Sequence, residues 1–335
     1  MIWIMGLGIN INAAKVHQRW HYPEETLYKI FYSMIDEDNN LVASFYMAPV
    51  MTMNADKINK FAPHGQGPNE LTNLVGMCLY KGNLALAEHP TKIKIYEKQD
   101  KTYKWKETKW LKSGKSVQMV KNIAYCNNKW FLAGSQEHSL KNGVLHASYL
   151  KVFSDDGKIL THLIQKKRKV FKRYYMMNYY IPKSKNKLYF ISEDEMAVTI
   201  IDPVKVIEEK KVKLEAPPFY KALPEHFYAF KKAKHHLASL KKDLQTWKTG
   251  YSRITHAVIV GNYLILQVRT CSEELKNFAN LIYNKDNFKL EKTLYTDDFL
   301  MGGRENKLYS FANGNPGIDE DTDDCIINIT EINSL

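Results

Sequence analysis

Three aspartates at alternate positions form the clearest chemical pattern in this sequence. Asp319, Asp321 and Asp323 lie in the acidic segment 318–325. Calcium loops use this spacing because it aims several hard carboxylate oxygens at one point. The glycine and glutamate that complete an EF-hand loop do not follow, so an exposed acidic loop is the alternative. We predict Ca²⁺ as the one candidate metal here and no other cofactor.

Motifs of known catalytic chemistry are absent from the chain. It contains no GxSxG elbow, no HExxH pair, no P-loop and no GxGxxG turn after a strand. Its four cysteines, at positions 78, 126, 271 and 325, form no CxxC pair, so they predict neither a zinc ribbon nor a thioredoxin-type site. The pattern favours a non-catalytic protein, while a metal site assembled from distant segments would escape such a search.

The composition is that of a globular protein with an excess of positive charge. Of 335 residues, 44% are hydrophobic and 25% charged, and the formal net charge is +12. Such a charge is compatible with nucleic acid, anionic membranes or acidic glycans as partners. No stretch is long and apolar enough to span a bilayer. The apolar segment 1–14 lacks a basic start, so it reads as a truncated signal peptide or as an apolar strand.

An asparagine turn leading into an apolar strand recurs six times. The markers are Asn40, Asn83, Asn128, Asn186, Asn262 and Asn306, and three of the five intervals between them are 43–45 residues. The other two intervals are that length plus an insertion. Strand-rich repeats of this size are typical of propeller blades. We therefore predict one all-β domain over residues 11–335, a six-bladed β-propeller of four-stranded antiparallel blades.

The ends of the chain predict how the ring closes. Each marker is flanked by further short apolar strands, but the sixth repeat stops after its third strand. The segment Ile11–Trp20 precedes the first repeat and has no other place in the pattern. We predict that it pairs with Cys325–Ile332 as the missing outer strand, which removes two exposed sheet edges. Coincidental hairpins in another all-β fold are the alternative.

One loop between the first and second repeats is distinctive. Residues 61–70 read FAPHGQGPNE, which resembles the G-x-G-P-x-E signature of the TolB-like and NHL-like six-bladed propellers common in Bacteroidetes. The likeness extends to residue 98 and implies a binding scaffold of the cell envelope or periplasm. Physically, two glycines and a proline suit a sharp turn from the rim to the channel, and Glu70 is placed to bind backbone N–H groups of that turn.

In a propeller, the loops that carry a ligand site share one face. These loops join the outer strand of one blade to the inner strand of the next, or the second strand of a blade to its third. They place acids, two histidines and two tyrosines there. The binding-face candidates are Gly65, Gly67, Asn69, Glu70, Glu88, His89, His138, Glu193, Arg269, Tyr179 and Tyr180.

Two basic segments are expected in connections on that same face. The insertion 214–249 contains, at 228–244, apolar residues at helical spacing with lysines on the other side, which predicts an amphipathic helix capping the domain. The tract 166–173 is expected in a solvated loop. Either could instead bind nucleic acid or a membrane surface.

These observations favour a monomeric, non-catalytic binding propeller of the cell envelope that recognises a protein, peptide or carbohydrate. The alternative is a channel-metal enzyme such as a lactonase-like hydrolase, which requires carboxylates and amides from several blades to converge. A basic protein that binds nucleic acid or a membrane surface is third, and a cytoplasmic location is the alternative to the envelope.

Overall fold

The computed structural model describes most of the chain. The residues described are 16–22, 30–45, 48–88, 92–112, 119–141, 144–169, 178–224, 246, 249–272, 274–312 and 325–332. For residues 119, 135–141, 144–147 and 166–169 only the backbone is described. The apolar segment 1–14 and the acidic segment with Asp319, Asp321 and Asp323 lie outside these residues.

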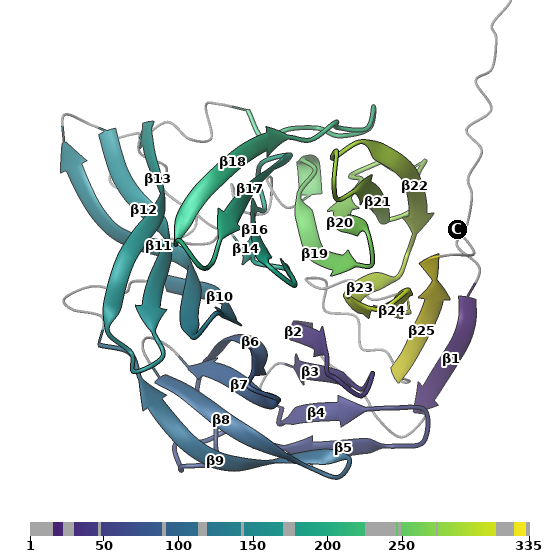
Figure 1. The fold of residues 1–335 in the computed structure, drawn as a ribbon. Coiled ribbons are helices and arrows are strands. Elements are labelled where there is room, and N and C mark those ends of the chain that lie inside the picture. Colours follow the sequence, from purple (N-terminus) through teal and green to yellow (C-terminus); the bar gives the residue numbers. More distant parts are fainter. Residues whose placement is uncertain are drawn as a thin grey trace, which may run out of the picture.

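Six antiparallel sheets stand around a central axis, each a blade of four or five strands (Figure 1). The innermost strands are β2 (Ile30–Ile35), β6 (Leu74–Tyr80), β10 (Met119–Cys126), β14 (Tyr179–Tyr180) with its continuation β15 (Lys183–Ser184), β19 (Ile254–Val260) and β23 (Phe299–Arg304). The second strands are β3 (Leu41–Phe45), β7 (Asn83–Glu88), β11 (Lys129–Lys141), β16 (Lys187–Ser192), β20 (Tyr263–Arg269) and β24 (Lys307–Phe311).

The outer half of each blade completes the sheet. The third strands are β4 (Val50–Met53), β8 (Lys92–Gln99), β12 (Val144–Ser154), β17 (Ala197–Asp202), β21 (Phe278–Asn284) and β25 (Cys325–Glu331). The outermost strands are β5 (Ile58–Phe61), β9 (Thr102–Trp110), β13 (Ile159–Lys169), β18 (Ile207–Lys213), β22 (Leu290–Thr296) and β1 (Val16–Tyr22). The predicted all-β, six-bladed propeller is confirmed.

The asparagine markers lie at the hairpins between the first and second strands. At the third blade, Asn127 and Asn128 have φ angles of 48° and 55°, the left-handed pair that a two-residue hairpin requires. At the second blade, Gly82 adopts a φ angle of 78°. The repeat seen in the sequence is therefore a repeat of turn chemistry.

The ring closes through the two ends of the described chain. Strand β1 pairs antiparallel with β25, with Trp20 opposite Ile327, and the two strands lie side by side in Figure 1. Arg19 Nε donates to Asn328 Oδ1 at 3.0 Å, and the Trp20 ring is buried against Tyr309. The predicted closure is confirmed, although β1 continues to Tyr22 and residues 11–15 are outside the described residues.

The core is divided among the interfaces between blades. In the described residues, six clusters of buried apolar side chains each join neighbouring blades. Blades packed on both faces need continuous apolar strands, and β3 and β4 are buried at every position. The outermost strands face solvent on one side, so β18 is largely exposed and charged. This packing holds the innermost strands around the channel.

The structure differs from the sequence prediction at two of the expected loops. The tract 166–173 was expected in a loop, but its first residues, 166–169, pair with 144–147 as part of β13, so that expectation is wrong for them. His138 likewise lies inside β11 instead of a loop, because this hairpin extends beyond the usual blade length. The amphipathic helix predicted at 228–244 lies outside the described residues. No helix in the described part of the chain could cross a membrane.

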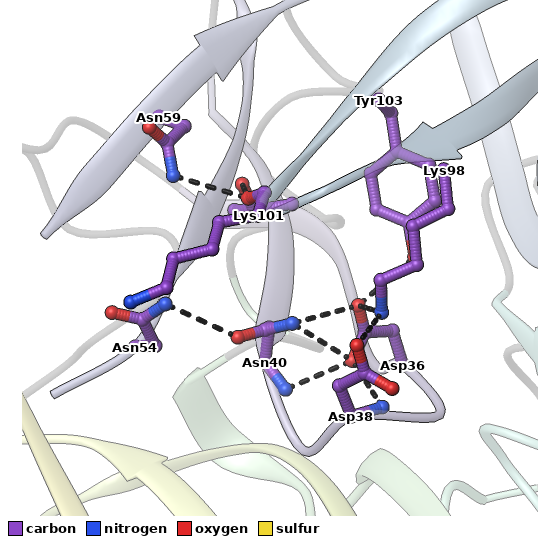
Figure 2. Close-up of polar contacts among 9 residues, drawn as sticks. Asp36, Asp38, Asn40, Asn54, Asn59, Lys98, Lys101 and Tyr103 are labelled. Carbon is purple, nitrogen blue, oxygen red and sulfur yellow. Dashed lines mark hydrogen bonds and ion pairs between the residues drawn. The ribbon is translucent and has the colours of Figure 1, made fainter.

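A buried polar network ties the first two blades together on the face that carries the hairpins between first and second strands (Figure 2). Asp36 is fully buried and accepts hydrogen bonds from the backbone N–H of Asn40 at 2.9 Å, Lys98 Nζ at 3.0 Å and the Tyr103 hydroxyl at 2.9 Å. Burial acts to raise the pKa of Asp36, but the hydrogen bonds from Asn40, Lys98 and Tyr103 outweigh it and hold that pKa below its ordinary value. Its ionised carboxylate therefore stabilises the fold.

Replacing Asp36 with Asn should lower the free energy of unfolding by about 1–3 kcal/mol, because an amide cannot accept all of these bonds. Since the folded-state pKa is depressed, this stabilisation exists above the unfolded-state pKa and is lost as the pH falls through the folded-state value. Urea unfolding at neutral and acidic pH measures it. Asp38→Asn, at an exposed carboxylate beside the same Lys98, is the control and should change little. Equal effects of the two variants would contradict the prediction.

Candidate functional site

The predicted binding residues that the structure describes lie mostly at one end of the blades. Residues 62–73 connect β5 to β6, while Glu88 and Arg269 end β7 and β20, and Glu193 follows β16. Because neighbouring strands are antiparallel, the ends of the second strands and the starts of the innermost strands share one face. We call this the entry face.

The loop of residues 62–73 folds around the carboxylate of Glu70. Its Oε2 accepts a hydrogen bond from the Gly67 N–H at 2.7 Å, as predicted. The Gly65 N–H donates to the Leu71 carbonyl at 3.0 Å, and the Leu71 N–H donates to the Pro63 carbonyl at 2.8 Å. A Cβ at Gly65 would lie 2.1 Å from Glu70 Oε2, so any other residue there would displace this carboxylate from the turn. The Glu70 carboxylate thus shapes the turn.

A buried ion pair holds this loop to the second blade. Glu88 and Lys94 are 3% and 4% exposed, and their Oε2 and Nζ atoms are 3.5 Å apart. Lys94 Nζ also donates to the carbonyls of Gly67, at 3.0 Å, and Glu70. Glu88 Oε1 accepts hydrogen bonds from the N–H and hydroxyl of Thr72. Glu88 is therefore occupied in supporting the loop.

A second buried ion pair joins the fourth and fifth blades. Glu193 is 1% exposed, and its Oε1 lies 3.1 Å from Arg253 Nη1. Its Oε2 accepts the Asn178 N–H at 2.6 Å, and its backbone carbonyl accepts the Ile254 N–H at 2.9 Å. Burial raises the pKa of Glu193, and the Arg253 guanidinium opposes that rise. The pair fixes the start of two innermost strands.

Further polar side chains surround this pair where the channel opens. The Tyr180 hydroxyl donates to the Thr255 carbonyl at 2.8 Å, and its ring lies 6.0 Å from His256. Burial raises the pKa of Tyr180, with Glu193 and the Tyr32 hydroxyl of the first blade adding to it. Since the innermost strands surround the central axis (Figure 1), these groups gather at one opening. We call Tyr32, Lys121, Tyr180, Glu193, Arg253, His256 and Arg269 the channel-mouth cluster.

The chemistry of the channel-mouth cluster suits recognition. Burial lowers the pKa of His256 to about 4, so its ring is neutral at physiological pH. Among the residues described, none forms a hydrogen bond with the His256 ring, which contacts Tyr180 and Phe299 through ring packing. A neutral imidazole with free nitrogens can accept or donate a hydrogen bond to a ligand. The aromatic rings of Tyr180 and Phe299 lie beside it.

Four members of the channel-mouth cluster were not expected from the sequence. Lys121 and His256 interrupt the apolar runs of β10 and β19, and this interruption is a usable signal. A charged or polar residue in an innermost strand must face the channel or neutralise its charge. Tyr32 and Arg253 carry no comparable signal.

The other candidates lie in varied surroundings. Tyr179 is 2% exposed and packs between the third and fourth blades against Phe190. The Asn69 carbonyl accepts a hydrogen bond from the Tyr96 hydroxyl at 3.0 Å. His89 lies outside the described residues, as does the His138 side chain, and the ligand roles of all these residues stay predictions.

Two further features bear on chemistry at the entry face. Within the part of the chain that the structure describes, no three His, Cys, Asp or Glu side chains gather to hold a metal ion. A cavity of about 310 Å³ lies between the first and second blades, lined among others by Phe31, Phe45, His64 and Leu74.

Comparison with known proteins bears on the fold of this chain. No protein-family model matches the chain, and no curated protein matches it in sequence. Among solved structures, it is similar to a member of the DUF4221 family from Bacteroides vulgatus, with a TM-score of 0.59 and 10% identity over 95% of this chain and 98% of that one. A "putative exported protein" from Bacteroides fragilis matches with a TM-score of 0.59 and 9% identity over 96% of each chain. At such identities the likeness shows a shared propeller fold.

Proposed function

We propose that this chain is a non-catalytic binding propeller whose ligand docks at the channel-mouth cluster. One observation carries the proposal: side chains from the first, third, fourth and fifth blades lie near one another at the channel opening, and those of Lys121, His256 and Arg269 form no hydrogen bond with any described residue. A rigid scaffold that presents such groups in a concave opening is the usual form of a ligand site. The ligand class is a protein, peptide or carbohydrate, bound by a monomer.

We place the protein in the cell envelope of a Bacteroidetes-type bacterium, within the TolB-like and NHL-like group of propellers. The glycine–proline loop at 65–70 and the exported-protein name of one structural neighbour support this proposal. A Ca²⁺ site at Asp319, Asp321 and Asp323 remains a separate prediction, which isothermal titration with Ca²⁺ would check.

The channel mouth can be tested by screening the purified chain against arrays of glycans and peptides. We expect a ligand whose affinity falls about tenfold in His256→Ala, which corresponds to one lost hydrogen bond and ring contact. Lys210→Gln, at an exposed position of outer strand β18, is the control and should bind like the wild type. Turnover of the ligand would contradict a non-catalytic role. Absence of any ligand, or binding unaffected by His256→Ala, would contradict the site.

A further inference from the structure

Positive charge exceeds negative charge at the channel-mouth cluster. Glu193 is matched by Arg253 at 3.1 Å, whereas Lys121 and Arg269 form no ion pair or hydrogen bond with any residue that the structure describes. The neighbouring carboxylate of Asp194 is engaged by the Ser192 hydroxyl. Among the residues that the structure describes, neither cation therefore has an ion-paired counter-ion.

These two cations are partly removed from solvent. Burial lowers the pKa of Lys121, and the carboxylate of Glu193 opposes that change. Burial also lowers the pKa of Arg269, with the nearby guanidinium of Arg253 adding to it. Folding has desolvated both groups, and no described residue forms an ion pair with either, which costs free energy unless another molecule supplies a partner. Such a cost is characteristic of binding sites.

The positions of the two cations indicate which kind of ligand they could bind. Lys121 lies on β10 of the third blade, near enough to Glu193 for that carboxylate to act on it, and Arg269 ends β20 of the fifth blade, where its backbone N–H donates to the Arg253 carbonyl at 2.9 Å. Tyr180 and His256 add aromatic surface next to that pair. A ligand that carries an acidic group on a ring or a chain would contact the cations and the aromatic rings at the same time.

We propose that the channel-mouth cluster receives a small anionic ligand whose carboxylate or phosphate group is bound by Lys121 and Arg269. This inference rests on the proposed binding function and specifies its ligand. A guanidinium can bind such a group through two parallel hydrogen bonds, and an ammonium adds a point charge. A neutral sugar or peptide would leave both cations unmatched.

The test compares probes that differ mainly in charge. Isothermal titration with galacturonate, citrate and inorganic phosphate should detect binding, while neutral galactose should bind at least about tenfold more weakly than galacturonate. Lys121→Gln and Arg269→Gln should each weaken galacturonate binding by about tenfold or more. Raising NaCl from about 50 mM to about 300 mM should weaken it in the wild type. Lys210→Gln is again the control.

A second measurement does not need a ligand. Because Lys121 lacks a partner among the described residues, Lys121→Met should leave the melting temperature of the ligand-free protein unchanged or higher. A lower melting temperature would show that Lys121 is structural and would overturn the inference.

The outcomes separate this inference from the proposed function. If galactose binds as well as galacturonate and only His256→Ala weakens it, the channel mouth binds a neutral ligand and the anionic inference is overturned. If none of the three anions binds, the inference is overturned, whatever the arrays show. Phosphate binding that is insensitive to both charge variants would indicate an adventitious ion only.

Discussion

Replacing Lys94 with Met is expected to lower the free energy of unfolding by about 3–5 kcal/mol, the usual cost of removing one partner of a buried ion pair. The variant leaves the carboxylate of Glu88 buried without its cation, and it removes the donor to the carbonyls of Gly67 and Glu70. Loss of this donor should also loosen the loop at 62–73. Urea unfolding measures the first effect, and hydrogen exchange at the Gly67 and Leu71 amides measures the second.

The same carboxylate offers a matched control. Lys92 Nζ lies 4.0 Å from Glu88 Oε2, but its side chain is 37% exposed, so Lys92→Met should cost at most about 1 kcal/mol. Adding Glu88→Gln to Lys94→Met should restore part of the lost stability, because the unpaired charge is then gone. Equal costs at Lys92 and Lys94 would refute the assignment of the buried pair.

The cost at Glu88 should also depend on pH. Burial acts to raise the pKa of Glu88. The hydrogen bonds from Thr72 and the charges of Lys94 and Lys92 outweigh this effect, so the pKa lies below its ordinary value. An acid with a depressed folded-state pKa stabilises the protein above its unfolded-state pKa, and this contribution is lost as the pH falls through the folded-state value. The difference between wild type and Glu88→Gln should therefore shrink in acid.

Replacing Arg253 with Met should be comparably damaging, with a loss of about 3–5 kcal/mol at neutral pH. Glu193 would then be buried with no ion-paired partner among the described residues, and the junction of the fourth and fifth blades would lose its ionic link. The pKa of Glu193 is already raised by burial, and without Arg253 it should rise further. Thermal and urea unfolding measure the loss.

The wild-type contribution of Glu193 depends on pH in the opposite direction to that of Glu88, although both mutational losses shrink in acid. An acid whose folded-state pKa is raised keeps its stability below the unfolded-state pKa and loses it as the pH rises through the folded-state value. The deficit of Arg253→Met should therefore be small near about pH 5 and large near about pH 8. Glu195 lies in the same loop as Glu193, and its ion-pair partner Lys211 is exposed. Lys211→Met should therefore cost little at either pH. A deficit independent of pH would mean that lost packing, and not the charge of Glu193, causes it.

The sequence predicted the framework well because its signals are local. Paired asparagines such as Asn127 and Asn128 mark a hairpin whatever surrounds them, since few other residues tolerate their backbone angles. Ring closure followed from counting, because a strand was missing at one end and unassigned at the other. Even Glu70 was placed correctly, since its partner Gly67 lies within the same turn.

The site was harder to predict because its partners are distant in the chain. The entry face seemed rich in acids, yet Glu193 and Glu195 are each paired with a cation from another segment, and Glu88 is paired with Lys94 of the neighbouring strand. Arg253 is 60 positions from Glu193 and follows a long insertion, so no spacing links them. Lys121 could have been found, because a lysine in an apolar innermost strand has only the channel to face.

The closing pair β1 and β25 also bears on how the polypeptide acquires its fold. Arg19 and Asn328, which are hydrogen bonded, are 309 positions apart, so the ribosome makes almost the whole propeller between them. Until β25 emerges, the nascent chain carries an unpaired strand edge and no circular constraint, and such long-range pairing is slow to form. The first blades must therefore persist as an open stack during synthesis. Anything that delays the final blade would leave this chain exposed to aggregation or to capture by chaperones.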